Sequence, residues 1–180
     1  MLGQMSHEER IAAQVTTVME SLPVNREMKA ALILRVQKLP KDPSGDNFTE
    51  WCRLFSWDHE GIVAGHIPPE TFNLLRVLHD LIIEKTVFST QTKENLLQEK
   101  KIKFDFCIMF VKQGGFNFIV NFFNQLEKTN LDTSTLRNKA LTMLLQIIPH
   151  FLSQKLFPSI KDSLTDKILY TIFDQNLKLI

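Results

Sequence analysis

Hydrophobic residues recur along this chain at three- and four-residue intervals, the spacing that places them on one side of an α-helix. The pattern is clearest on either side of the adjacent pair Gly114-Gly115. Glycine ends a helix readily because it adopts positive φ, and a second glycine lets the next helix turn away. The stretch 104–123 therefore predicts two helices that meet at a tight corner, with more Phe than one helix face needs. Its regularly spaced apolar residues are Phe106, Cys107, Phe110 and Val111 before the pair, and Phe116, Ile119, Val120 and Phe123 after it.

The same spacing predicts helices over most of the remaining chain. Two points stay open: residues 89–98 form either a short helix around Leu96 and Leu97 or a loop, and Pro149 either kinks its helix or ends it at Ile148. Residues 151–157 continue as helix or turn. The predicted helices are 6–22, with the capping box Ser6–Glu9 and a stop at Pro23; 25–36, capped by Asn25; 48–56; 69 to near 88; 136–148; and 164–177.

No segment shows the alternation of a half-buried strand, so we predict an all-α chain of roughly seven to nine helices. A closed bundle and an open solenoid both fit such a list. Helical units recurring about every 40 residues favour an armadillo/HEAT-like α-solenoid, as a single domain over residues 1–180. The chain stays apolar up to Ile180 without a helix C-cap, which predicts a fragment of a larger protein.

Charge narrows the classes of partner. A net charge of +1 over 180 residues provides no broad basic field for nucleic acid. The basic edge of the second predicted helix has acids among its cations and few aromatic residues, and the run 99–103 (EKKIK) is typical of a solvated face. There is no signal peptide and no uncharged run long enough to span a membrane, so we expect a cytoplasmic or nuclear protein with protein partners. The basic edge consists of Arg26, Lys29, Arg35, Lys38 and Lys41.

The two cysteines are expected to be free thiols in a reducing compartment, since neither belongs to a CxxC motif. Cys107 lies among phenylalanines and is predicted to be core. Cys52 could act as a nucleophile with His59 or His66 as its base. No glycine-rich oxyanion loop or positioned Asn/Asp accompanies them, so a structural thiol is favoured.

The remaining polar candidates also favour structural roles. His59, Glu60 and His66 could contact zinc, but their spacing crosses a glycine-containing loop and provides no fourth ligand. His79 is interpreted as a packed or capping residue, and His150 as a partner for carbonyls freed at Pro149. Gly114-Gly115 could bind phosphate, but lacks the preceding strand and following Lys-Ser/Thr of a phosphate loop. We therefore predict no catalytic residue, no cofactor and no metal.

Four short motifs occur in a characteristic order. The motifs are Leu22-Pro23-Val24-Asn25, then Trp51 with Leu54-Phe55-Ser56, then Phe72-Asn73-Leu74-Leu75-Arg76-Val77-Leu78, and finally Phe110-Val111 with Gly114-Gly115-Phe116. In this order and spacing they resemble the armadillo-like N-terminal scaffold of very large, fat-facets-like ubiquitin-specific proteases. The similarity covers most of residues 22–151.

The resemblance implies a non-catalytic segment of a deubiquitinating enzyme that positions substrates or partners. The Cys box and His box of that family's catalytic domain do not appear in this sequence, so no catalytic residue is carried over. Two other functions remain open. One is an armadillo-like regulatory or adaptor domain of another family, such as a formin or a transport adaptor. The other is a small enzyme that uses Cys52.

Overall fold

The computed structural model describes residues 21–41, 47–57, 67–83, 93–128 and 135–153, together with Arg10, Ile11, Gln14, Thr17, Val18 and Pro158. Within this part the chain is helical and contains no strand, which confirms the all-α prediction. Six helices are found there, fewer than the seven to nine expected. They are α2 (Arg26–Gln37), α3 (Phe48–Leu54), α5 (Pro69–Ile82), α6 (Lys93–Lys112), α7 (Gly115–Lys128) and α8 (Thr135–Phe151).

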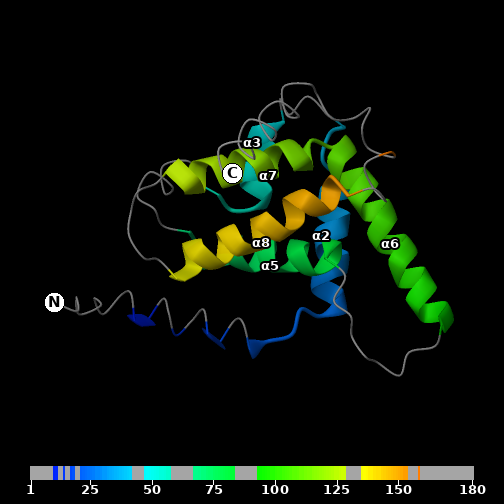
Figure 1. Ribbon diagram of the computed structural model, residues 1–180, viewed down its shortest axis with the longest axis horizontal. Coiled ribbons are helices and arrows are strands. Elements are labelled where there is room, and N and C mark those ends of the chain that lie inside the picture. The colour runs from blue at the N-terminus through cyan, green and yellow to red at the C-terminus, as the bar shows by residue number, and fades with distance from the viewer. Residues whose placement is uncertain are drawn as a thin grey trace.

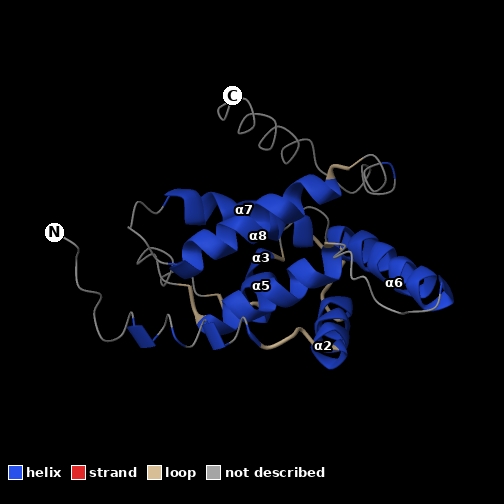
Figure 2. Cartoon of the chain, turned by 60° about the horizontal axis from the view of Figure 1, so that its bottom comes forward, coloured by secondary structure: helices blue, strands red, loops and turns tan. Residues whose placement is uncertain are grey.

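The helices pack around α8, which lies between α5 and α7 (Figure 1). Helix α3 packs against α7, and α2 packs against both α5 and α6. The most extensive helix pair, α5 with α8, joins segments separated by two intervening helices. The N-terminal part of α6 (residues 93–105), called its projecting half below, extends away from the other helices (Figure 2). The core is therefore formed by helices that are distant in sequence, with one helix projecting from it.

The predicted corner at the glycine pair is confirmed. The axes of residues 97–112 and 115–126 differ by 74°. Gly114 has a φ of 78°, a left-handed conformation that ordinary side chains rarely adopt. A Cβ at Gly115 would lie 2.7 Å from the ring of Phe110, so only a hydrogen atom fits there. The first glycine thus permits the turn, and the second permits the close approach of the two helices.

Helix α7 is buried on nearly all sides, which explains the excess of Phe in its sequence. Phe116, Ile119 and Val120 are buried as predicted, but Phe118 and Phe122 on other sides of the helix are buried as well. The ring of Phe118 is stacked at 5.7 Å on Trp51 and lies 4.9 Å from that of Phe55, both contributed by α3 or its C-cap. The helix keeps a polar side at the exposed Asn121, and its buried residues pack against both α3 and α8.

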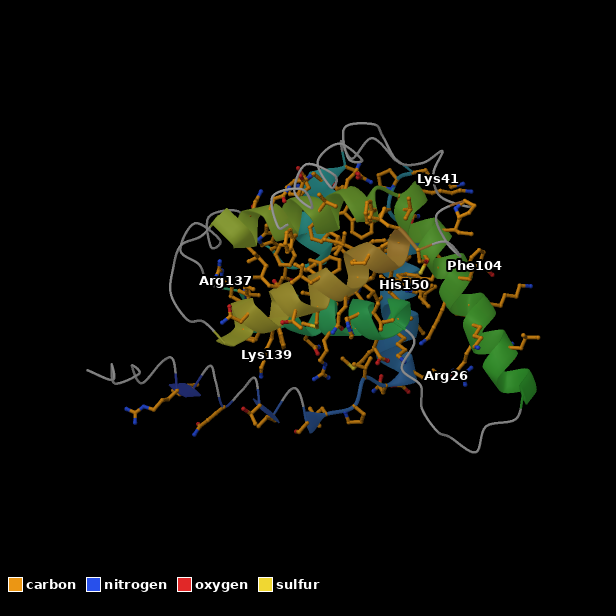
Figure 3. The ribbon with its side chains drawn as sticks, viewed as in Figure 1. Arg26, Lys41, Phe104, Arg137, Lys139 and His150 are labelled. Carbon is orange, nitrogen blue, oxygen red and sulfur yellow. The ribbon has the colours of Figure 1, made fainter. Side chains whose placement is uncertain are left out.

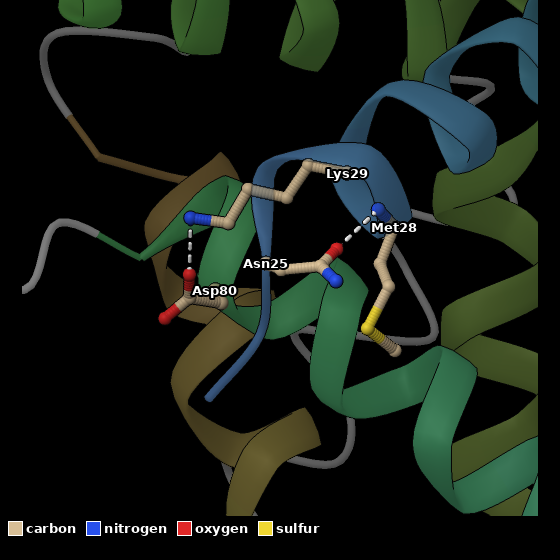
Figure 4. Close-up of polar contacts among 4 residues, drawn as sticks. All are labelled: Asn25, Met28, Lys29 and Asp80. Atoms are coloured by element: carbon tan, nitrogen blue, oxygen red, sulfur yellow. Dashed lines mark hydrogen bonds and ion pairs between the residues drawn. The ribbon is translucent and has the colours of Figure 1, made fainter. Parts of the chain in front are cut away.

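The start of α2 is stabilised as the sequence predicts. The Asn25 side chain accepts a hydrogen bond of 2.8 Å from the backbone N–H of Met28, as in an N-cap (Figure 4). One turn further on, Lys29 forms an ion pair of 2.5 Å with Asp80 of α5 (Figure 4). These contacts orient α2 against α5.

The short helix α3 ends at Leu54, two residues before the predicted end at Ser56. The N–H of Trp57 donates to the Cys52 carbonyl at 2.8 Å, and that of Ser56 donates to the Arg53 carbonyl at 3.1 Å. With Ser56 at a φ of 51°, this is a Schellman motif in which serine occupies the position usually held by glycine. The sequence analysis did not predict this helix end, because residue 56 is a serine and not the glycine that usually follows a helix in this motif.

Two other boundaries differ from the predictions. Helix α5 ends at Ile82, since Ile83 has extended backbone with ψ of 127°, so the end predicted near residue 88 was wrong. Leu96 and Leu97, assigned to a short helix or a loop, lie within the single 20-residue helix α6. Hydrophobic spacing identified these segments as helical but did not show where the packed region stops.

Helix α8 continues through Pro149 to Phe151, so of the two alternatives left open for Pro149 the stop at Ile148 is wrong. Proline lacks an N–H, and the carbonyl that loses its partner belongs to Leu145. Both Leu145 and Pro149 lie on the exposed side of the helix, where water can bind the freed carbonyl. Since proline lacks only its own N–H, one intrahelical hydrogen bond is lost, and it lies close to the end of the helix at Phe151.

Several predictions fall outside the described residues. They concern the capping box at residues 6–9, most of the helix predicted over 6–22, residues 154–157, and the helix predicted over 164–177.

Candidate functional site

Cys52, the sequence's candidate nucleophile, lies on α3 and is partly buried against the core. Burial raises the pKa of its thiol to about 11, while a backbone hydrogen bond partly opposes the shift. A nucleophilic cysteine requires the opposite shift, because the thiolate is the reactive form. His59 and His66 lie outside the described residues. The surroundings of Cys52 are thus those of a structural thiol.

Cys107 is a core residue, as predicted. It lies on α6, and its side chain is buried in the hydrophobic core. Burial raises the pKa of its thiol to about 12, and the positive charge of Lys103 opposes the shift only in part. Both cysteines are free.

The glycine corner is closed to phosphate. Gly114, Gly115 and Phe116 are all buried. The Gly114 N–H already donates to the Val111 carbonyl at 2.9 Å. An anion-binding turn presents its amides to solvent, whereas the residues of this turn are buried.

A buried polar cluster that the sequence analysis missed surrounds Gln113, one residue before the glycines. The Gln113 carbonyl accepts hydrogen bonds from Asn47 Nδ2 at 2.9 Å and from Trp51 Nε1 at 2.8 Å. The Gln113 side-chain amide donates to the carbonyls of Gln37 and Leu39, each at 3.3 Å. Asn47 Nδ2 also lies 3.1 Å from the Pro40 carbonyl.

This Gln113 cluster connects the end of α2, the start of α3 and the end of α6. The last carbonyls of a helix have no partner within it, and at α6 the donors come from α3. A buried carbonyl without a donor is costly, so the cluster fixes how these three segments meet. The double glycine indicated a helix end, where backbone carbonyls lack partners within the helix. The sequence did not identify the side chains that donate hydrogen bonds to them.

The two described histidines occupy structural positions. The His79 ring on α5 contacts the Gln146 side chain on α8, with 2.5 Å between Nε2 and Oε1, which agrees with the prediction of a packed residue. The His150 ring lies edge-on to Phe151, with ring centroids 6.4 Å apart. Its predicted bond to carbonyls freed at Pro149 stays a prediction.

Three of the exposed large apolar residues of the described helices lie on the projecting half of α6. Leu97 is 73% exposed, Ile102 46% and Phe104 41%. A shallow hollow that is widely open to solvent lies along this helix, and every residue that lines it belongs to α6. It is lined by Leu97, Gln98, Lys100, Lys101 and Phe104.

Basic residues gather at the same end of the molecule. Residues 26–41 hold five basic residues and one acidic residue, and α6 holds five lysines and three acidic residues. The net charge of these two segments is therefore +6, in a chain whose total is +1. Arg26, Lys41 and Phe104 lie at this end, and Arg137 and Lys139 lie at the other (Figure 3). Sequence analysis identified the basic edge of α2 but not its proximity to α6.

The described residues contain no group of three or more His, Cys, Asp or Glu side chains arranged to hold a metal ion. No single described helix has the length and apolar character of a membrane span. Residues 97–112 and 115–126 together pass that test by length and composition, across their 74° bend. Comparison of the chain with protein-family models, with curated proteins and with solved structures finds no match.

Proposed function

We propose that this chain is a non-catalytic, armadillo-like helical scaffold that binds other proteins. The observation that carries the proposal is the combination of a rigid helical core with an exposed, apolar and basic end formed by α2 and α6. Large exposed apolar side chains grouped on one surface mark interaction sites in soluble domains.

The contacts within the core support the armadillo-like part of the proposal. Helices α6 and α7 meet at a glycine corner, and the next helix, α8, packs on α7. This is the relation expected between the last helices of one repeat and the first helix of the next. The contact between α5 and α8 is also consistent with stacked layers of helices.

The resemblance to fat-facets-like ubiquitin-specific proteases supports a more specific role. In that role the chain is a segment of a large deubiquitinating enzyme and positions substrates beside a catalytic domain elsewhere, in the cytoplasm or nucleus. The raised pKa of the Cys52 thiol agrees with a segment that contributes no nucleophile. The flanking sequence of the gene tests this role: a downstream Cys-box and His-box domain is expected, and flanking regions without one would contradict it.

Photo-crosslinking tests the scaffold function itself. A photoreactive benzoylphenylalanine replaces Leu34, Leu97 or Leu145 in turn, which are exposed residues of α2, α6 and α8. In cells we expect reproducible adducts with discrete proteins from at least one position. Absence of protein adducts from all three faces, in variants with wild-type helical content, would contradict a scaffold.

A further inference from the structure

We propose that the projecting half of α6, together with the outward face of α2, docks an acidic amphipathic segment of a partner protein. This inference rests on the proposed scaffold function and adds the chemistry of the partner. The partner segment carries apolar side chains flanked by carboxylates. The residues on this chain that we expect to make the principal contacts are Leu97, Lys101 and Phe104 of α6, and Leu34 and Lys38 of α2.

The first step is the geometry of α6. Leu97, Lys101 and Phe104 follow one another at i, i+4 and i+7, so they form one stripe along the helix. All three are exposed and all three line the hollow. Apolar side chains at this spacing are the usual anchors for a helix laid in a groove. The stripe thus provides two apolar contact points with a cation between them.

The second step is the charge of the surface. Arg26, Arg35, Lys38 and Lys41 are exposed on or beside α2, where Glu27 is the single acid. The positive charge of Lys29 is balanced by its ion pair with Asp80, so Lys29 does not add to the surface charge. A partner with carboxylates beside its apolar side chains complements both features. Such complementarity mainly increases the association rate and the specificity.

The third step separates an acidic protein from nucleic acid. Glu99 and Asp105 lie within the projecting half of α6, where they would repel a continuous phosphate backbone. Phe104 is the only aromatic side chain in that half, so successive bases would have no stacking platform. A peptide can place its carboxylates opposite the lysines and leave those two acids in solvent.

The direct test uses the full chain and a synthetic probe. The probe is a 16-residue fluorescent helical peptide with Leu at i, i+4 and i+7 and Glu on both flanks of that stripe. Fluorescence anisotropy measures its Kd, and we expect affinity that weakens several-fold between 50 and 300 mM NaCl because exposed charges are screened. A matched peptide with Lys in place of every Glu is expected not to bind. Equal binding of both peptides would overturn the proposal.

Substitutions locate the site. The double variant Lys101→Glu/Phe104→Ala is expected to weaken probe binding by about tenfold or more, since it reverses one charge and removes one anchor. Two controls make the same kinds of change on other helices: Arg53→Glu on α3 and Leu145→Ala on α8, both at exposed positions. We expect each control to change Kd less than about twofold. Circular dichroism checks that every variant keeps its helical content.

Other occupants give distinct results. Self-association of the chain that Lys101→Glu/Phe104→Ala abolishes would assign this end to a second copy. A crosslink from position 97 to residues 154–180 of the same chain would assign it to the chain itself. Preferential binding of single-stranded DNA or phosphatidylserine vesicles over the Glu peptide would assign it to a polyanion. Each of these outcomes overturns the proposal.

The scaffold function and this docking site fail in different ways. If protein adducts form at position 145 but not at 34 or 97, and the Glu peptide does not bind, the scaffold stands and the acidic docking site is wrong. If no position forms adducts, the scaffold itself fails.

Discussion

At the scale of single residues, a few buried polar atoms connect segments that are far apart in sequence. Gln113 is 4% exposed, and its carbonyl holds the side chains of Asn47 and Trp51. Trp51 contributes in a second way, since its ring packs edge-on at 5.0 Å against that of Phe110. One side chain therefore joins the polar cluster to the aromatic core.

Trp51→Phe tests this coupling. The substitution removes the Nε1 donor to the Gln113 carbonyl and leaves unfilled space in the core, so we expect the free energy of unfolding to fall by about 1–3 kcal/mol. Urea denaturation followed by circular dichroism measures it. Arg53→Ala, an exposed change on the same helix, should stay within about 0.5 kcal/mol. If Trp51→Phe and Arg53→Ala lower the free energy of unfolding by similar amounts, the hydrogen bond from Trp51 to the Gln113 carbonyl adds little to stability.

The thiol of Cys52 gives a second prediction at this scale. Its pKa is raised from 9.0 to about 11, so the protonated form is favoured and the thiolate fraction at neutral pH is lowered. We expect iodoacetamide to alkylate Cys52 roughly a hundredfold more slowly than a thiol of pKa 9.0, because two pKa units correspond to that ratio. The rate should rise about tenfold per pH unit toward pH 11. Mass spectrometry at several pH values follows it, and rapid stoichiometric labelling at pH 7 would restore the enzyme hypothesis.

At the scale of elements, helix ends determine how the chain turns. The corner between α6 and α7 needs a left-handed residue at 114 and no side chain at 115. The end of α3 needs the same left-handed conformation but has Ser56 in that position. The two sites differ in how well their residue suits the backbone.

Gly115→Ala should destabilise the corner. The new Cβ would lie 2.7 Å from the Phe110 ring, which cannot shift freely because Trp51 and Phe151 pack on it at 5.0 and 5.7 Å. Overpacking of this kind costs about 1–3 kcal/mol in the free energy of unfolding, measured by thermal or urea denaturation. Asn121→Ala, an exposed site on α7, is the control and should stay within about 0.5 kcal/mol. If Gly115→Ala leaves the free energy of unfolding unchanged, α6 and α7 can move apart to accommodate the added methyl group.

Ser56→Gly should have the opposite effect. Glycine adopts φ near 51° without the steric penalty that serine bears there, so we expect the variant to be more stable by roughly 0.5–1 kcal/mol. The gain is reduced by the greater freedom of glycine in the unfolded chain. Ser21→Gly serves as the comparison and should lower stability, because Ser21 is helical and its hydroxyl donates to the Val18 carbonyl at 2.7 Å. A loss of stability for Ser56→Gly would contradict this interpretation of the turn.

At the scale of the whole molecule, one end differs from the rest. The helices α5, α7 and α8 form the packed centre, and α6 projects beyond it with apolar and basic residues exposed (Figures 1 and 2). A compact domain of this length has a radius of gyration of about 16 Å. If the chain is an open helical repeat, small-angle scattering should give a clearly larger radius. A value at the compact limit would favour a closed bundle.

The sequence by itself determined the features that depend on neighbouring residues. Hydrophobic spacing located the helical segments, Asn25 was identified as a cap, and Gly114-Gly115 as a corner. These follow from the period of the helix and from the dihedral preferences of single residues, which act within a few positions of the chain.

Only the tertiary structure decided the rest. It paired α5 with α8, supplied donors from α3 to the Gln113 carbonyl, ended α5 at Ile82, and left half of α6 uncovered. It also placed Arg26 and Lys41 of the basic edge at the same end as Phe104 (Figure 3). The physical reason is that burial and hydrogen-bond partners here come from residues more than sixty positions away, which local periodicity does not encode.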